Sequence, residues 1–388
     1  MVCGFVLLVA SYALLMTSFV RTTGKLEGAD FLMFYSIGRV GRQYGFHQVY
    51  NLSLEASAQA QTAGVQPGTW QILLPNHPPF LYPFLELLAG LDYRTAYIGH
   101  AMLLVFLVVA GMPVLFRVLR RNNWPRTQTW IGLTGVILFE PFFISVLKGQ
   151  DSAVLLLGGL LWFCGVVQDN DPLAGLGLSL TLIRPQIALL LAIPFLFRRR
   201  KVFIWFCGGG LVLGLYSFAM IGWTGAKDFL QILTLSAIGS GYGLAEAAMF
   251  NFTGLALRIA PGLSTNIVHV LSWGLFCAAM VGLCIIWIHS KFIDYRHIAL
   301  AVTLSLFASP HLHYHDLALL VIPMLCLGLA GINAGKLTVR IAATLPMLAS
   351  LVFLTGEFED VTRYAFPYLL IVILPGLSWL VEKRRENH

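Results

Sequence analysis

The chain has 388 residues, of which 58% are hydrophobic and only 11% are charged. Soluble domains carry about 25% charged residues. Apolar runs of about 18 residues or more recur to the end of this sequence, so it predicts a polytopic membrane protein. Lipid cannot satisfy backbone polar groups, and the alternation of barrel strands is missing, so the spans are expected to be helices. The net charge of +7 is spread over short loops and gives no indication of a nucleic-acid partner.

The first span is expected at residues 2–20, followed by a long polar loop at residues 21–95. This loop carries Asp30 just beyond the span and four prolines within the nine residues 75–83. Prolines at this density forbid a regular helix there, and the short apolar piece 84–91 is expected to lie in the interface or to re-enter. Further spans are predicted at residues 96–116, 127–146 and 153–167.

The next apolar stretch, residues 173–197, is interrupted by Arg184 and Pro185 and ends in the basic cluster 198–201. A single kinked span would put this cluster outside the membrane. Two half-helices that form a re-entrant hairpin would leave it inside. The positive-inside rule favours the hairpin, and a proline after a buried arginine accommodates the break.

A span at residues 202–221 and a second polar loop at residues 222–261 follow. The remaining spans are expected at residues 264–288, 298–308, 317–330, 341–354 and 364–381. With the N-terminus inside, most Lys and Arg residues fall in inside loops. We therefore predict an all-α, polytopic helical bundle that forms a single domain over residues 1–388, with about 10–12 transmembrane helices and interfacial helices in the first outer loop.

This topology puts several polar clusters on one outer face, as an active site or a gate would require. Asp30 is a candidate general base, or an idle interfacial acid. A guanidinium in an apolar stretch is costly, so Arg184 is expected to face a phosphate, which its planar fork suits, or else to form a structural ion pair or snorkel. The corner Lys148–Asp151 is expected to contact a headgroup or a sugar, or to be a plain polar turn.

Two further clusters have a functional and a structural interpretation. His311 and His315 would share one face of a helix and could contact a sugar or a phosphate, or simply end a span. A zinc site would need a second ligand cluster with matching spacing, so no metal is predicted. The loop with His77 and Tyr82 could form an aromatic wall for a sugar or a lipid chain, or could pack on itself. No nucleotide-binding motif occurs, which favours a lipid-linked substrate.

The order of these motifs resembles that of the GT-C glycosyltransferases, in particular the family 87 mannosyltransferases that use polyprenol-phosphate mannose. The motifs that carry the resemblance, between about residues 28 and 330, are Asp30-Phe31 with Tyr35 and Gly38, Pro78-Pro79 with Tyr82-Pro83, Lys148-Gly149-Gln150, Arg184-Pro185-Gln186, and Ser309-Pro310-His311 with His315-Asp316.

The resemblance implies a multi-pass protein of the bacterial inner membrane with an active site on its outer side. It implies a polyprenyl-phosphate sugar donor, a lipid or glycan acceptor, inversion at the anomeric carbon, and no cofactor. Asp30 would be the general base, and Arg184 and Lys148 would bind the donor phosphate. The sugar or the acceptor would contact Gln150, His311, His315, His77, Tyr82 and Tyr35.

One departure from the family pattern leaves the substrates open. The lead into Pro78-Pro79 is usually rich in tyrosine, but here it is Leu74-Pro75-Asn76-His77. The acceptor and the sugar, expected to be mannose, are therefore not determined by the sequence. Two other functions stay open: a transporter or flippase of a lipid-linked or anionic solute, with Arg184 in a broken helix, and a ligase that moves a whole oligosaccharide. No internal repeat supports the transporter.

Overall fold

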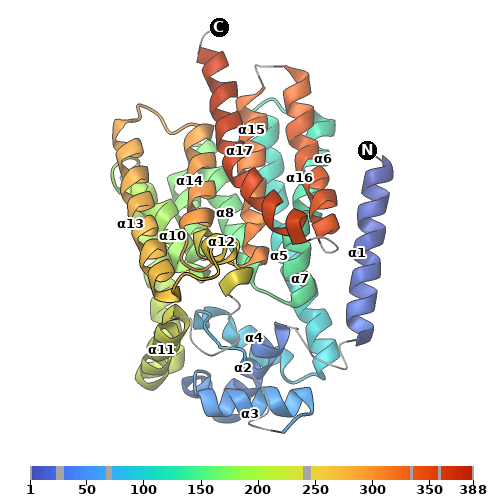
Figure 1. Cartoon of the computed structure of the whole chain (residues 1–388), viewed down its shortest axis with the longest axis vertical. Coiled ribbons are helices and arrows are strands. Elements are labelled where there is room, and N and C mark those ends of the chain that lie inside the picture. Colours follow the sequence, from blue (N-terminus) through green and yellow to red (C-terminus); the bar gives the residue numbers. More distant parts are fainter. Residues whose placement is uncertain are drawn as a thin grey trace.

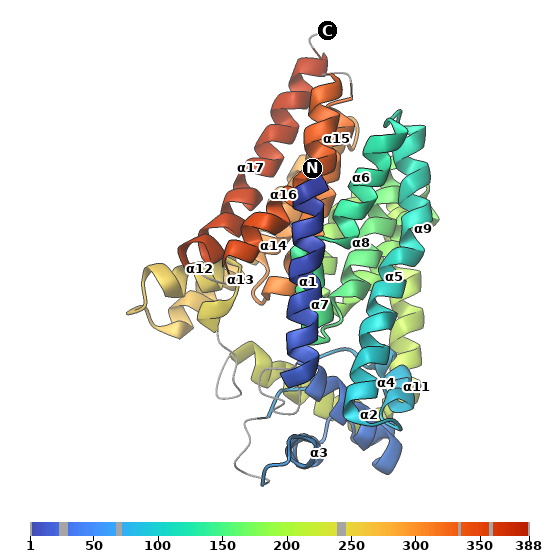
Figure 2. The same ribbon diagram turned by 90° about the vertical axis from the view of Figure 1, so that its right-hand side faces the viewer.

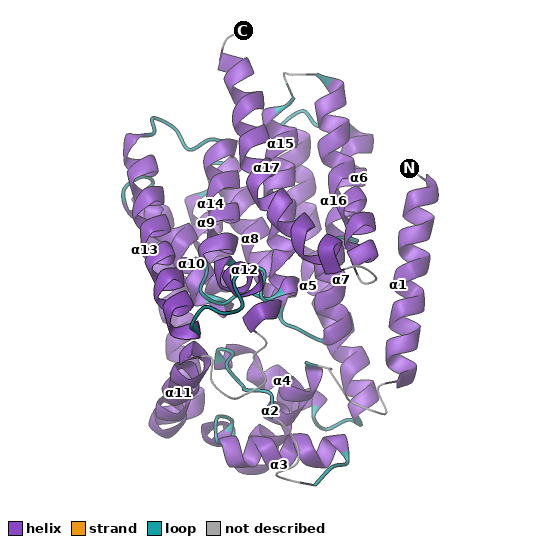
Figure 3. Ribbon diagram, in the orientation of Figure 1, coloured by secondary structure: helices purple, strands orange, loops and turns teal. Residues whose placement is uncertain are grey.

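The computed structural model describes residues 2–22, 30–66, 72–238, 246–332, 335–356 and 360–386. This part of the chain is helical and contains no strand (Figure 3). In chain order its α-helices and 3-10 helices (η) are α1 (Val2–Thr22), α2 (Phe31–Tyr44), η2 (Phe46–Gln48), α3 (Leu52–Ala63), η3 (Pro79–Leu81), α4 (Tyr82–Leu88), α5 (Tyr93–Arg121), α6 (Arg126–Ile137), α7 (Glu140–Lys148), α8 (Ser152–Val167), α9 (Asp171–Leu180), η4 (Thr181–Ile183), α10 (Pro185–Ala192), η5 (Ile193–Leu196), α11 (Arg200–Ile238), η6 (Glu246–Ala248), α12 (Phe252–Ile259), α13 (Thr265–His289), α14 (Tyr295–Ala308), η7 (Tyr314–Leu320), α15 (Val321–Ala330), α16 (Lys336–Gly356) and α17 (Asp360–Glu386).

Seven helices in the described part of the chain are long and apolar enough to cross a membrane. They cover residues 3–21, 93–121, 126–148 (α6 and α7 together), 200–236, 265–289, 336–356 and 363–381. Six further apolar segments are 10–17 residues long, and the predicted total of about 10–12 spans counted several of them as crossings. The prediction of a polytopic helical membrane protein is confirmed.

The shorter helices form the interior of the bundle, and the long ones surround them. Every residue of α15 is buried, whereas α1 and α11 expose most of their apolar side chains. α8 packs closely on α9 through glycines: a Cβ at Gly165 would lie 2.3 Å from the backbone nitrogen of Ala174. Small residues allow such close approach between helices in a membrane.

The short helices α2, α3 and α4 gather at the end of the molecule opposite the C-terminus (Figure 1). α1 leads down to this end and α5 leads away from it, as the view turned by 90° shows (Figure 2). The first predicted outer loop, residues 21–95, therefore carries short helices at one end of the bundle, as expected. Residues 23–29 and 67–71 of this loop lie outside the described residues.

Residues 173–197 form a hairpin rather than one kinked span. Arg199, which follows the stretch, forms an ion pair with Asp171 at its start, with 2.6 Å between Nη2 and Oδ1. A Cβ at Gly175 in α9 would lie 2.4 Å from Cβ of Trp205 in α11. Both ends of the stretch therefore lie together, and Arg184 occupies the tip between η4 and α10.

The span predicted at residues 127–146 agrees with the apolar segment 126–148, but it is built from two helices, because α7 begins anew at Glu140 with Pro141 in its first turn. Proline suits the first turn of a helix but not its interior. The loop predicted at residues 222–261 is helical as far as Ile238, and it also contains α12.

A kink at Gly222 turns the second half of α11 beneath the bundle. Gly222 has a φ of 64° and a ψ of −170°, a conformation that glycine adopts without steric cost. The second half of α11 packs against the first outer loop, where the ring of Phe229 lies 4.7 Å from that of Tyr50. Nδ2 of Asn76 also donates a hydrogen bond to Oγ of Ser236, at 3.1 Å. The kinked helix thereby holds the loop that carries His77.

Candidate active site

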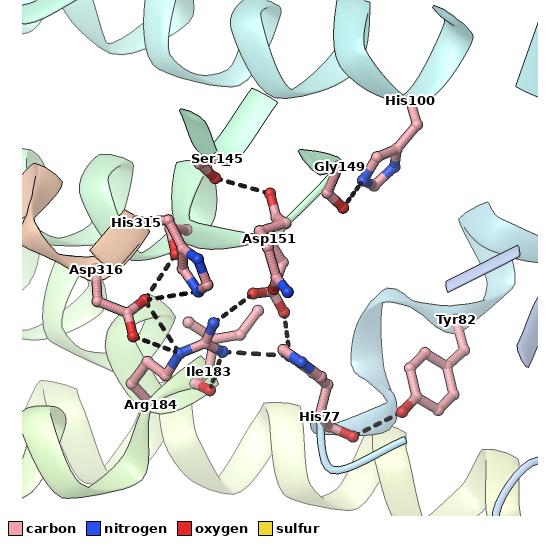
Figure 4. A network of polar contacts seen from close by, with 12 residues as sticks. His77, Tyr82, His100, Ser145, Gly149, Asp151, Ile183, Arg184, His315 and Asp316 are labelled. Carbon is pink, nitrogen blue, oxygen red and sulfur yellow. Dashed lines mark hydrogen bonds and ion pairs between the residues drawn. The ribbon is translucent and has the colours of Figure 1, made fainter. Parts of the chain in front are cut away.

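Four segments that are distant in the sequence meet around the hairpin tip (Figure 4). They are the loop with His77, the turn before α8 with Asp151, the tip itself with Arg184, and η7 with Asp316. All four of these side chains are buried, and Asp316 is fully inaccessible. A buried charge is costly unless it is paired and hydrogen-bonded, and each of these groups has such partners.

Arg184 is held between two aspartates. Its Nη2 lies 2.9 Å from Oδ1 of Asp151, and its Nε lies 3.2 Å from both carboxylate oxygens of Asp316. Ser152 Oγ donates a further hydrogen bond to Asp316 Oδ1, at 2.7 Å. The buried ion pair, one of the interpretations open from the sequence, is thus present. The contact between Arg184 and a donor phosphate stays a prediction.

His77 is fixed at both its ring and its backbone. Its Nδ1 lies 2.6 Å from Oδ2 of Asp151 and 3.2 Å from Nη1 of Arg184. Because an ionised Asp151 can only accept, the shorter contact is a hydrogen bond that Nδ1 donates. The hydroxyl groups of Tyr50 and Tyr82 both donate to the His77 carbonyl, each at 2.7 Å. Burial opposes ionisation of Asp151, but Arg184 and His77 keep its pKa below the usual value. The contacts at Nδ1 and at the carbonyl fix the imidazole ring, and Nε2 is the ring nitrogen that these contacts leave unused.

The corner between α7 and α8 requires glycine at position 149. Gly149 has a φ of 74°, and a Cβ there would lie 2.6 Å from Cβ of Phe31 at the start of α2. His100 Nε2 lies 3.0 Å from the carbonyl of Gly149, and Ser145 Oγ donates to the carbonyl of Gln150 at 2.9 Å. These contacts bring the corner directly against the beginning of α2.

Asp30 lies at that beginning, among polar groups from the corner and the His77 loop. The Gln150 side chain is a hydrogen-bond partner of its carboxylate, and Lys148 and His77 act on it through their charges. Burial nevertheless raises the pKa of Asp30, while Lys148, Gln150 and His77 oppose that rise. Three of the sequence-predicted site residues are thus grouped around the predicted base.

Most of the candidate site lies in a segment that matches a known protein family. The model of glycosyltransferase family 87 matches residues 76–310 of the chain. The chain belongs to glycosyltransferase family 87. No curated protein and no solved structure was found to match it. As a family 87 member the chain is a membrane glycosyltransferase. The prediction of an enzyme is therefore confirmed, and the family match does not support the alternative of a transporter.

The family 87 match divides the predicted site residues. His77, Lys148, Gln150 and Arg184 lie within the matched segment. The predicted base Asp30 and Tyr35 lie before it, and His311 and His315 lie after it. For these flanking residues, the link to the family 87 segment rests on their contacts in the structure.

The histidines near the end of the family 87 match lie in a loop and a 3-10 helix. Because η7 begins only at Tyr314, His311 and His315 do not share the face of one helix, and that expectation is wrong. Gln186 Nε2 donates to the carbonyl of His311 at 3.0 Å, next to the hairpin tip. The ring of His315 lies near Asp316, with 3.8 Å between Nε2 and Oδ1. The histidines therefore flank the Arg184 cluster.

The two predicted tyrosines use their hydroxyl groups within the protein. Tyr82 is fully buried and supports His77 through the hydrogen bond to its carbonyl. Tyr35 OH donates to the carbonyl of Leu91 at 2.8 Å, and its ring lies 5.2 Å from that of Tyr93. Both tyrosines help to build the region around Asp30 and His77, and their contact with a sugar or an acceptor stays a prediction.

Sequence reasoning noted Asp151 and Asp316 without giving them a role, although they are the partners of Arg184. The signal was the arginine itself, because a guanidinium inside an apolar stretch needs an acid nearby. Both acids lie in loops that the predicted topology puts on the same side as the hairpin tip. His100 was also missed, since a single histidine in an apolar run resembles an ordinary core residue.

Proposed function

We propose that this family 87 protein transfers a hexose, with mannose as the expected sugar, from a polyprenyl-phosphate sugar to a hydroxyl group of a lipid or glycan acceptor. The reaction would take place at the outer face of the membrane and invert the anomeric carbon. The observation that carries the proposal is the grouping of Asp30 with Lys148, Gln150 and His77. At one end of the bundle, a carboxylate thus lies within the electrostatic influence of a cation.

Asp30 is proposed to act as the general base. As the acceptor oxygen attacks the anomeric carbon, the Asp30 carboxylate takes the proton of that hydroxyl group. Burial raises the pKa of this carboxylate, which makes it a better proton acceptor than an exposed aspartate. Gln150 holds the carboxylate through its hydrogen bond, so one oxygen can be presented to the acceptor.

Lys148 is proposed to stabilise the leaving group. The bond between the anomeric carbon and the phosphate oxygen breaks as the new glycosidic bond forms, so negative charge grows on the phosphate and positive charge on the sugar. A fixed cation beside the phosphate stabilises this distribution of charge. Lys148 is not a member of any ion pair in the described part of the chain, so its charge is available to a phosphate. Arg184 would reach the phosphate only if one of its two aspartates gave way.

The replacement of Asp30 by asparagine tests the proposal. Asp30→Asn keeps the shape and the hydrogen bond to Gln150 but cannot accept a proton. We expect transfer to fall by about 10²–10⁴-fold, the range of a general base, while expression and thermal unfolding stay unchanged. The assay uses purified protein, a labelled polyprenyl-phosphate mannose and a membrane lipid extract as acceptor. Near-normal turnover by this variant would rule out Asp30 as the base.

A further inference from the structure

An apolar groove with a volume of about 350 Å³ lies beside the charged cluster. Three elements line it: the prolines that follow His77, the hairpin tip at Leu182, and both halves of α11. Its walls include Pro78, Pro79, Leu182, Gly214, Phe218 and Phe229. The lining is almost entirely hydrocarbon, so the groove suits an apolar chain rather than a sugar.

The kink and the glycines of α11 create this groove. The positive φ of Gly222 turns the second half of the helix, so that Phe229 faces the same space as Gly214 of the first half. A Cβ at Gly214 would meet no atom within 4 Å, so this glycine borders empty space rather than a close neighbour. A Cβ at Gly210, one turn earlier, would lie 2.9 Å from Leu182.

The groove connects lipid with the candidate active site. At its polar end, Pro78 directly follows His77, and Leu182 lies two residues before Arg184. At its outer end, Phe218 and Leu230 are 47% and 63% exposed. They belong to a helix that buries little of its apolar surface. A chain in the groove would therefore extend from the bilayer to the charged cluster.

We infer that the groove holds the first isoprene units of the polyprenyl chain of the donor, with the phosphate at the end beside His77, which belongs to the group around Asp30 and Lys148. This inference rests on the proposed function and names a binding site for the lipid portion of its donor. Transfer of a chain from lipid into a groove gains little hydrophobic free energy. The groove thus acts mainly by packing against the branched chain and by orienting the phosphate.

Gly214→Leu introduces an apolar side chain into the groove lining, and its Cβ is unobstructed because nothing lies within 4 Å of it. Leucine also has a higher helix propensity than glycine, so the variant should fold. Gly208→Leu is the matched control, since a Cβ at Gly208 also meets nothing within 4 Å but Gly208 does not line the groove. Transfer is measured with a C55 polyprenyl-phosphate sugar and with a C5 prenyl-phosphate sugar, whose single isoprene unit leaves most of the groove empty.

We expect Gly214→Leu to raise the KM for the C55 donor about tenfold, the size of one lost apolar contact. The KM for the C5 donor, the KM for the acceptor and the behaviour of Gly208→Leu should stay close to wild type. An unchanged KM for the C55 donor would overturn the inference. A rise in the KM for the acceptor alone would also overturn it, because the groove would then hold the acceptor.

Photolabelling tests whether the groove binds the polyprenyl chain, independently of sugar transfer. Polyprenyl phosphate with a diazirine on its second isoprene unit is irradiated with the wild-type protein, and the labelled peptides are identified by mass spectrometry. Label in α11 or at residues 78–80, lost in Gly214→Leu but kept in Gly208→Leu, supports the groove. Such labelling without any sugar transfer would refute the proposed reaction alone. Transfer with labelling elsewhere would refute the groove alone.

Discussion

Opposing influences act on the carboxylate of Asp30. Burial raises its pKa, and the charge of Lys148 and the hydrogen bond from Gln150 lower it. The pKa of an unperturbed aspartate is about 3.9. A base must be ionised, so the rate of transfer should rise with pH through a midpoint that the pKa of Asp30 sets.

Gln150→Ala should therefore move the acidic limb of the pH profile to higher pH. The variant removes a hydrogen bond that stabilises the ionised form of Asp30, so a higher pH is needed to remove the proton. The measurement is kcat/KM as a function of pH for the wild type and the variant. An acidic limb that moved to lower pH, or stayed in place, would show that Gln150 does not stabilise the base.

Arg184→Ala should destabilise the protein as well as lower its activity. The variant leaves Asp151 and Asp316 as uncompensated buried acids, and removal of one partner of a buried ion pair costs about 3–5 kcal/mol. Thermal unfolding followed by size-exclusion chromatography measures this loss. Arg184→Ala combined with Asp316→Asn should recover part of it, because one of the two acids becomes neutral.

The kinetics of the same variants distinguish two roles of Arg184. If Arg184 binds the donor phosphate, Arg184→Ala raises the KM for the donor and lowers kcat, and the double variant does not restore either. If Arg184 acts only through the ion pairs, the double variant regains activity together with stability. Recovery of both would count against direct contact with the phosphate.

The sequence indicated that Arg184 has a partner but could not identify it. Asp316 is 132 residues further along the chain, and only the packing of η7 against the hairpin tip brings the two together. The same limit applies to Tyr82: the sequence predicted contact with a sugar or an acceptor, but it could not show that the hydroxyl group donates to the His77 carbonyl. Motifs reveal which residue types are present, whereas hydrogen-bond partners depend on tertiary packing.

At the scale of elements, the corner at Gly149 controls how α7, α8 and α2 meet. We expect Gly149→Ala to reduce both stability and transfer. The left-handed conformation costs an alanine about 1–2 kcal/mol, and the added Cβ would lie 2.6 Å from Cβ of Phe31. α2 or the corner must then move, which displaces Gln150 and Lys148 from Asp30.

Gly64→Ala provides the matched control for this prediction. Gly64 has a similar φ of 70°, but a Cβ there would meet nothing within 4 Å. It should show the conformational cost alone, with transfer per folded molecule unchanged. Equal losses of specific activity in the two variants would mean that close packing against Phe31 does not matter.

Hydropathy predicted the elements well where a helix was long and apolar, and less well elsewhere. It located α5, α13 and α16 within a few residues, because their apolar runs are uninterrupted. It missed the second half of α11, where Thr224, Lys227 and Asp228 interrupt the apolar pattern. That half lies beneath the bundle, so its sequence does not need to resemble a membrane span.

At the scale of the whole molecule, the basic loops and the candidate site lie at opposite ends of the bundle. The positive-inside rule then predicts the end with α2 and α3 to be outside the cell. In a variant without its six native cysteines, Gln61→Cys should react with a membrane-impermeant maleimide in intact cells. Lys291→Cys should react only after permeabilisation. Both positions are exposed, and the reversed pattern would invert the topology.

The hairpin also has a consequence for how the protein is made. A ribosome delivers Arg184 long before Asp316, so at first the guanidinium has only Asp151 of its two acidic partners. The second acid arrives only with η7, after the five helices α10 to α14 have been synthesised. The end of the bundle that contains the candidate site can thus reach its final arrangement only late in biosynthesis. Products truncated before η7 should therefore be substrates for membrane quality-control proteases.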